Sequence, residues 1–469
     1  MGLWWILQSP MSLNALARNL SCSLLLFALN GPPTMPRKKT MPESTTVLNT
    51  PFTLPCGVTL KNRIAKGAMT EGLSDETNMA KPSHARLYRR WAEGGTGLLI
   101  TGNVMVDHRY LERPGNIAID GKQTNEQLSA LKDLSRSGQV NGTAIWIQLN
   151  HAGRQTPDFI NPQPVGPSAV QTHTSGVKFG LPRALEEQDI QEIIQRFGYA
   201  AGIARQTGFN GVQIHSAHGY LLSSFLNPNA NKRQDQWGGN LKNRARLLRE
   251  VVRSVRENVG PEYPVGVKLN SSDFQKGGFS NQDCIQVAQW LQEEGIDLLE
   301  ISGGNYESPA MVDLPEEKQR DSTRKREAYF LEFAQMLHDS KTPPLMVTGG
   351  NRTRQAMEKA IGQSGVSIIG IARPLCGQPD GPNLIFSGAI GTLQKMEEEV
   401  RIGPGILGFH SPFKFIAQLN GWGQLAWCVR QMHEMSEGCP PNRKFGALGS
   451  FIWLEKHNKR ILTRMKGQS

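Results

Sequence analysis

The sequence predicts a closed parallel barrel of eight β-strands and eight α-helices, a (β/α)8 TIM barrel. From residue 62 to residue 372 the chain repeats one unit: a short apolar run, a loop with Gly or Asn, and a longer stretch with apolar residues every three or four positions. Eight such repeats are typical of this barrel. The rival fold is an open doubly wound sheet, but no GxGxxG motif follows the first apolar run.

The elements follow from this alternation. We expect the strands at residues 63–69, 97–105, 144–149, 211–217, 265–270, 298–304, 345–350 and 366–372. Helical spacing is clear at residues 188–207, 240–258, 282–294 and 325–338. The stretch "FTLPCGVTLKNR" at 52–63 predicts a hairpin with its turn at Cys56-Gly57, placed so that it could close the bottom of the barrel.

The ends of the chain differ from its body. Residues 1–42 form a basic leader, either a targeting segment or a disordered extension, and 50–385 hold the barrel. Residues 386–469 are expected to be a helical extension with a basic tail. The apolar run "SLLLFAL" in the leader is too short to span a bilayer, so we expect no stable membrane span. A cytoplasmic location is expected, with mitochondrial or secretory targeting left open by the leader.

Charge and cysteine content exclude several classes of protein. The net charge is +11, but residues 1–42 carry +4 and residues 441–469 carry +6, which leaves +1 for residues 43–440. A near-neutral body argues against a domain that binds nucleic acid. The six cysteines are scattered and form no CxxC pair, so a zinc ribbon or a cysteine-bound iron–sulfur cluster is not expected.

Barrel enzymes place their reactive groups at the carboxyl ends of the strands. The seventh and eighth expected strands end in "TGGNR" and in Ala372-Arg373. Glycine-rich loops followed by a helix start, with a cation beside them, are suited to bind phosphate. The sequence therefore predicts a phosphorylated cofactor or substrate at this end.

The fourth expected strand ends in "HSAHGY", which places His215, His218 and Tyr220 together. Four interpretations compete: a zinc site, a proton relay, a pair of donors to an anionic oxygen, or buried structural histidines. Zinc would need a third ligand, for which His151 is a candidate. Neutral imidazoles that donate to a carbonyl or phenolate oxygen account best for the spacing and for the tyrosine beside them.

At this point the residues show a resemblance. The stretch "HSAHGYLLSSFLNPNANKRQDQWGGNLKNRARLLREVV" resembles the fourth-strand signature of the Old Yellow Enzyme family, the FMN-dependent ene-reductases. "LKNRIAKGAMTEGLSD", "IQLNHAGRQ", "VGVKLNSSDF" and "IARPL" are similar to further motifs of the family, in the family's order, over residues 50–380. The resemblance implies an FMN-binding barrel that takes hydride from NADPH or NADH and reduces activated C=C bonds of small molecules.

The same resemblance implies roles for single residues. His215 and His218 would hold the carbonyl oxygen of the substrate, and Tyr220 would be the proton donor. Gln148 would contact the flavin pyrimidine edge, and Lys268 the N1–O2 locus. The remaining contacts to FMN would come from Thr70 at O4, from Ala68, Met69 and Gly102 along the ring, and from Gly350, Asn351, Ala372 and Arg373 at the phosphate.

Two residues depart from the family pattern: Ala68 stands where a proline is usual, and Gly72 replaces a bulky residue that often lines the substrate site. The size of the substrate therefore stays open. So do other functions, namely a flavin barrel that oxidises, isomerises or demethylates a biosynthetic intermediate, an RNA-modifying flavin barrel, and a non-catalytic FMN-binding protein. A homo-oligomer is possible.

Overall fold

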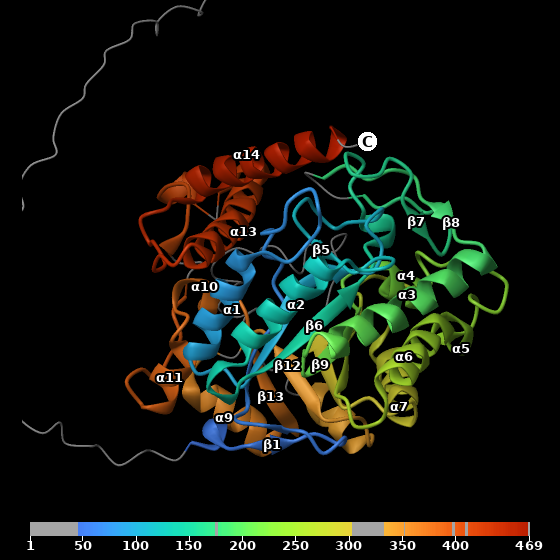
Figure 1. Ribbon diagram of the computed structural model, residues 1–469, viewed down its shortest axis with the longest axis horizontal. Helices are drawn as coiled ribbons and strands as arrows, with labels where there is room; N and C mark the ends of the chain where they lie inside the picture. The colour runs from blue at the N-terminus through green and yellow to red at the C-terminus, as the bar shows by residue number, and fades with distance from the viewer. Residues whose placement is uncertain are drawn as a thin grey trace, which may run out of the picture. The chain divides into compact units, whose positions relative to one another are not determined.

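The structure, a computed structural model, describes residues 46–173, 177–302, 333–350, 352–395, 399–408 and 411–467. All of them belong to one compact unit, Ser44–Ser469. Eight parallel strands form a closed barrel, because β3 pairs with β13 on one side and with β4 on the other (Figure 1). The predicted (β/α)8 fold is confirmed.

The barrel strands follow each other in chain order around the barrel. They are β3 (Ile64–Lys66), β4 (Leu98–Met105), β6 (Ala144–Asn150), β9 (Gly211–Ser216), β10 (Val265–Asn270), β11 (Leu298–Ser302), β12 (Leu345–Thr348) and β13 (Val366–Ile371). Short strands lie outside the barrel wall: β1 (Phe52–Thr53), β2 (Thr59–Leu60), β5 (Ile117–Ala118), β7 (Val165–Gly166) and β8 (Arg183–Ala184). The first barrel strand is shorter than predicted, so the residues from Ala68 to Thr70 lie in the loop after it.

Helices follow the strands as the alternation predicts. They are α1 (Pro82–Glu93), α2 (Asn125–Gly138), α3 (Glu187–Gln206), α4 (Leu221–Leu226), α5 (Leu241–Arg244), α6 (Arg246–Val259), α7 (Asn281–Glu293), α9 (Arg354–Gln363), α10 (Pro374–Gly377) and α11 (Gly381–Phe386). The predicted helix at 325–338 lies partly outside the described residues; residues 333–339 are helical. Within the described ranges, no helix is long and apolar enough to cross a bilayer.

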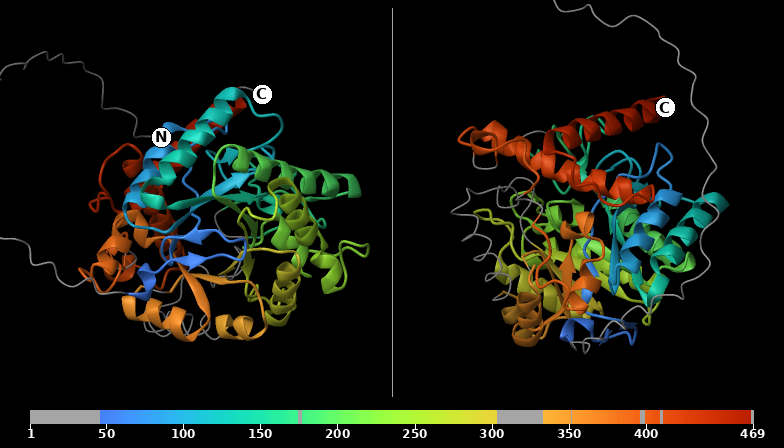
Figure 2. Two further views of the ribbon diagram at one scale, coloured as in Figure 1. Left: turned by 60° about the horizontal axis from the view of Figure 1, so that its bottom comes forward. Right: turned by 90° about the vertical axis from the view of Figure 1, so that its left-hand side faces the viewer.

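The lower end of the barrel is filled by apolar side chains and closed by the predicted hairpin. Strands β1 and β2 pair antiparallel, and the turn between them contains Cys56 and Gly57. Two hairpin residues join one buried cluster with inward-facing strand residues; the cluster comprises Leu54, Leu60, Ala65, Leu98, Ile100, Trp146, Leu298, Met346 and Ile368. The Cys56 amide also donates to Asp297 Oδ1 at 2.9 Å. The hairpin therefore seals the end opposite α14 (Figures 1 and 2).

The C-terminal extension contains two long helices, α13 (Lys414–Ser436) and α14 (Ala447–Lys466), which pack against each other. Helix α13 also packs against α1 and α10, beside the upper end of the barrel. Arg86 of α1 donates through Nε to the Ser436 carbonyl at 2.5 Å, which ties the end of α13 to the barrel. Figure 1 shows α14 across the end of the barrel where the strands finish.

Candidate functional site

Above the apolar layer, the inward-facing side chains become polar. Gln148 Nε2 donates to Gln213 Oε1 at 2.6 Å, and Gln213 Nε2 donates to Glu300 Oε2 at 2.8 Å. Lys268 Nζ lies 3.0 Å from Glu300 Oε1. All four side chains are buried. They come from four adjacent strands, β6, β9, β11 and β10, so strand register aligns them into one layer across the barrel.

Glu300 is a residue that the sequence reasoning missed. A lysine buried at a barrel strand end needs an anionic partner, because an unpaired buried charge is costly. The structure supplies that group within the chain, since Lys268 and its neighbour Glu300 pair across β10 and β11. The sequence signal that could have identified Glu300 was its position in "LLEIS", two residues before the strand end. A role of Lys268 at the flavin remains a prediction.

His215 and His218 lie next to each other at the top of this layer. His215 Nε2 is 3.2 Å from His218 Nδ1, and the two rings meet edge to face at 5.2 Å. His215 Nδ1 lies 3.0 Å from Asn103 Oδ1, and His218 Nε2 lies 2.7 Å from Ser302 Oγ. His218 has a left-handed backbone, with φ 61°, which is uncommon for a residue other than glycine and marks a constrained position.

Both imidazoles are neutral. Burial, His218 and Lys268 hold the pKa of His215 well below 6.5, while burial and Lys268 lower that of His218. A neutral imidazole has one N–H, so the contacts define a directed chain. With Asn103 Oδ1 as acceptor, His215 carries its proton on Nδ1 and accepts at Nε2 from His218, which accepts in turn from the Ser302 hydroxyl.

Tyr220 lies beside His215, with 4.9 Å between the ring centroids, and its side chain is 3% exposed. Asn103 Nδ2 lies 3.5 Å from the Tyr220 hydroxyl, 3.4 Å from Thr70 Oγ1 and 3.4 Å from Glu112 Oε2. Asn103 therefore links the histidine pair, the tyrosine and the loop after β3. The sequence analysis gave Asn103 no role.

The loop after β3 brings three predicted residues to the same end. Ala68, Met69 and Thr70 are half-buried, whereas the strand before them is fully buried. The Thr70 hydroxyl donates to Glu112 Oε2 at 2.9 Å, so its proton already has a carboxylate partner. The Gly102 amide donates to Glu71 Oε1 at 2.9 Å. Neither carboxylate was singled out from the sequence: Glu71 lies within the motif "LKNRIAKGAMTEGLSD" but was given no role, and Glu112 stands in a loop without a recognisable motif.

The last two strand ends carry the predicted phosphate site. Gly349 and Gly350 both have positive φ, 109° and 77°, and nothing lies within 4 Å of a methyl group built on Gly349. Ala372 is half-buried and Arg373 is exposed at the start of α10. Asn351 lies outside the described residues. An accessible glycine turn beside an exposed guanidinium suits a phosphate group, and this end of the site fits FMN.

Metal binding at the histidine pair finds no support among the described residues. His151 Nδ1 accepts from the Gly153 amide at 3.0 Å, and its ring stacks on Tyr110 at 5.1 Å. It does not join His215 and His218 in a group with metal-ligand spacing.

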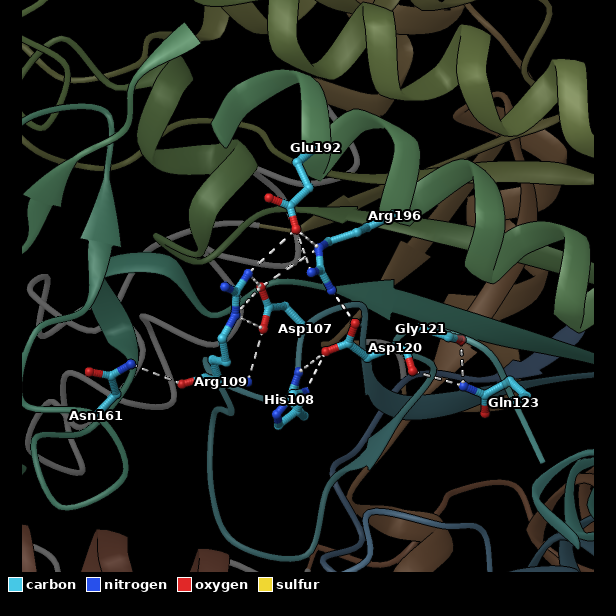
Figure 3. A network of polar contacts seen from close by, with 9 residues as sticks. All are labelled: Asp107, His108, Arg109, Asp120, Gly121, Gln123, Asn161, Glu192 and Arg196. Atoms are coloured by element: carbon cyan, nitrogen blue, oxygen red, sulfur yellow. Dashed lines mark hydrogen bonds and ion pairs between the residues drawn. The ribbon is translucent and has the colours of Figure 1, made fainter. Parts of the chain in front are cut away.

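The described residues do contain another cluster with that spacing, formed by Asp107, His108 and Asp120 (Figure 3). Its carboxylates already have cationic partners. Arg109 binds Asp107 at 2.6 Å, and Arg196 pairs with Asp120. His108 Nδ1 lies 2.5 Å from Asp120 Oδ2. This network is therefore an ion-pair cluster that joins the loop after β4 to α3.

Sequence comparisons agree with the geometry. The family model of the NADH:flavin oxidoreductase / NADH oxidase family matches residues 47–388. The chain is 37% identical over 357 residues to the NADH-dependent flavin oxidoreductase iliE of Hypocrea jecorina, covering 72% of this chain and 88% of that protein. It is 35% identical to iccE of Talaromyces variabilis, another NADH-dependent flavin oxidoreductase, over 71% of this chain and 85% of that one.

Solved structures show the same likeness. The Old Yellow Enzyme homologue from Zymomonas mobilis superposes with a TM-score of 0.61 at 26% identity, covering 75% of this chain and 95% of that one. Morphinone reductase has the same fold, with a TM-score of 0.62 at 24% identity over 76% and 93% of the two chains. The chain therefore belongs to the NADH:flavin oxidoreductase / NADH oxidase family, the Old Yellow Enzyme family of its motifs, with FMN as cofactor and NADH or NADPH as hydride donor.

Proposed function

We propose that this oxidoreductase reduces the C=C bond of small α,β-unsaturated carbonyl compounds. The observation that carries the proposal is the arrangement of His215, His218 and Tyr220 at the carboxyl end of β9. Two neutral imidazoles, with 3.2 Å between His215 Nε2 and His218 Nδ1, lie beside a buried phenol whose ring centroid is 4.9 Å from that of His215. Together they supply both groups that such a reduction requires. One group stabilises a developing oxyanion, and the other donates a proton.

The histidines would bind the carbonyl oxygen of the substrate. His218 Nδ1–H points to His215, so an oxygen that enters between the two rings can accept it. His215 would donate from Nε2 if the Asn103 amide turned and presented its Nδ2–H to His215 Nδ1. The contacts that Asn103 Nδ2 would lose are long, 3.4–3.5 Å, but the turn would also bring Asn103 Oδ1 towards Glu112 Oε2, so binding of the substrate oxygen has to offset the repulsion between these two acceptors.

Tyr220 would deliver the proton to the α-carbon from the face opposite to hydride addition. General acid catalysis needs a positioned donor within hydrogen-bond reach of the carbon that receives the proton. The edge-to-face contact with His215 holds the phenol beside the carbonyl site, and burial excludes bulk water as a competing acid. Tyr220 and the histidines therefore act on two different atoms of one substrate.

The cofactor would be held by residues of four strand ends and one loop. Gln148 and Lys268 would contact the pyrimidine edge, the loop from Ala68 to Thr70 would line the ring, and Gly350 and Arg373 would bind the phosphate. When bound, FMN supplies hydride. Glu300 holds the Lys268 ammonium in place from below, so the lysine presents its remaining N–H bonds towards the cofactor.

The test is the separation of the two half-reactions by anaerobic rapid mixing. We expect the purified protein to contain FMN. Addition of NADH or NADPH should bleach the flavin absorbance near ~450 nm, and a cyclic enone should then restore this absorbance with formation of the saturated ketone. An isomerase or demethylase would leave enones unreduced even though the bleaching occurs. The absence of enone-dependent reoxidation across a panel of small enones would contradict the proposal and leave the family assignment intact.

A further inference from the structure

The helical extension lies beyond residue 388, where the family match ends, yet it is firmly built onto the barrel. Within it, the Arg430 guanidinium lies 3.5 Å from the centroid of the Phe445 ring. Gln431 makes two hydrogen bonds to the Asn442 backbone, at 2.8 and 2.6 Å. These contacts join α13 to the connecting loop, and α13 packs directly against α14, so the two helices form one ordered hairpin rather than a loose tail.

Two histidines fasten this hairpin to the loop that follows β3. His433 Nε2 donates to the Glu71 carbonyl at 3.1 Å, and His457 Nε2 donates to the Gly72 carbonyl at 3.2 Å. Trp453 stacks on His457 with ring planes 13° apart, and it meets His433 edge to face at 4.9 Å. The same loop carries Thr70, so the extension is attached directly beside the candidate site.

From this attachment, the last turn of α14 reaches an apolar cluster that contains the proposed proton donor. Met465 is half-buried and packs against a buried cluster formed by Met105, Leu111, Ala118, Ala152 and Tyr220. Figures 1 and 2 show the C-terminal end of α14 above the loops at the upper end of the barrel. Tyr220 thus shares an apolar cluster with a residue that the chain contributes 245 positions later.

The loop after β3 leaves room at this point. Gly72 is buried, but a methyl group built on it would meet nothing closer than the Pro114 carbonyl oxygen at 3.9 Å. With φ 64°, the backbone at Gly72 disfavours a larger residue there. The loop therefore contributes no side chain of its own at Gly72, while α14 lies against its carbonyl.

We propose that Met465 forms a wall of the substrate site beside Tyr220 and sets the size of the substrate, with His433 and His457 as positioning residues that hold this wall against the barrel. The inference rests on the proposed function, since it places the substrate next to Tyr220. A methionine side chain is apolar and occupies space, so its volume would limit how large an unsaturated ring system fits beside Tyr220. The ligands expected to respond are small cyclic enones and phenols that differ in the number of rings.

Binding of two phenols to the FMN-loaded full chain tests the proposal without any need for turnover. Phenol and 2-naphthol are titrated while the flavin absorbance is followed. We expect Met465→Ala to tighten 2-naphthol relative to phenol by roughly tenfold, and Met465→Trp to weaken it by a similar factor, because one or two carbons in an apolar site change affinity by about this much. The matched control is Ile452→Trp on α14, where the side chain is 45% exposed and no change in the ratio is expected.

A second pair of variants tests the attachment. His457→Phe removes the donor to the Gly72 carbonyl. It should therefore raise the affinity for 2-naphthol relative to that for phenol, as Met465→Ala does. His457→Gln keeps a donor and should restore most of the original ratio. If His457 has only a structural role, both substitutions should lower thermal stability and leave the ratio of the two affinities unchanged.

The outcomes separate the two proposals. If the ratio of the two affinities is the same in Met465→Ala, Met465→Trp and the parent protein, Met465 is not part of the substrate site. If the ratio shifts as expected but no enone is reduced, the wall stands and the proposed reaction is wrong. If enones are reduced by all variants with the same preference for size, the reaction stands and the wall is wrong.

Discussion

The two ends of the barrel interior differ sharply although the same strands build both. Trp146 and Gln148 lie two residues apart on β6 and face the same interior. The first belongs to a buried cluster of nine apolar residues sealed by a hairpin, and the second to a buried chain of amides and charges. The difference shows how a barrel separates stability from function. Two residues further along β6, apolar packing gives way to hydrogen bonds and charge.

The largest expected effect at the upper end comes from Tyr220→Phe. The loss of the hydroxyl should slow enone-dependent reoxidation by ~10²–10⁴-fold, the range of general acid catalysis, and leave flavin reduction by NADH nearly unchanged. Rapid mixing of each half-reaction measures this. FMN content and thermal stability serve as controls, because Phe fills nearly the same volume. Equal losses in both half-reactions would mean that Tyr220 is structural.

At the lower end, Trp146→Ala should act on stability alone. The ring is fully buried, and methyl groups built on Gly211 and Gly266 would lie 2.6 and 2.9 Å from it, so strands β9 and β10 are shaped around it. Its truncation should lower the free energy of unfolding by about 3–5 kcal/mol. Urea unfolding of Trp146→Ala and the milder Trp146→Phe measures the loss. A drop in turnover per bound FMN, with stability unchanged, would contradict the separation of the two ends.

His218→Ala tests the upper end at a donor rather than at the acid. Loss of one oxyanion donor typically costs ~2.7–4 kcal/mol in the transition state, so the rate constant for enone reduction should fall by ~10²–10³-fold. Phenol binding should weaken as well. His218→Asn is the matched variant, because Asn tolerates a positive φ and keeps an N–H donor, and it should recover part of the loss. No difference between the Ala and Asn variants would exclude hydrogen-bond donation by His218.

The smallest effect per residue concerns the pH dependence of stability, to which the lower cluster does not contribute because it contains no histidine. Burial lowers the pKa of His433 to about 3 and those of His84 and His151 to about 4. The unfolded chain therefore binds more protons below pH 6.5, so stability is full above that pH and falls as pH decreases towards 4. Each such histidine contributes about 1.4 kcal/mol per pH unit within this window.

Urea midpoints at pH 7.5, 6.0 and 5.0 measure this slope. His433→Gln keeps a side-chain N–H for the Glu71 carbonyl but does not titrate. It should therefore reduce the slope of the unfolding free energy against pH by the share of one histidine, about 1.4 kcal/mol per pH unit. An unchanged slope in this variant would show that His433 is not held neutral by the contact between α13 and the loop after β3.

Much of the fold follows from local pattern. Apolar periodicity and turn residues determined the eight strands, the hairpin at 52–63 and the helices, because strand and helix formation depends on neighbours a few positions away. The rule that strand ends carry function then brought His215, His218, Tyr220, Gln148 and Lys268 to one end, and the structure places them there. Their roles, and the phosphate contacts, remain predictions.

Tertiary structure alone decided the partners of these residues. Lys268 meets Glu300 because β10 and β11 pair in a particular register, and Asn103 reaches His215, Thr70 and Tyr220 only because the barrel curves around them. Met465 packs against the cluster that contains Tyr220 because an extension outside the repeated pattern folds back over the strand ends. Such contacts join residues from 32 to 245 positions apart, and no local periodicity carries the information that pairs them.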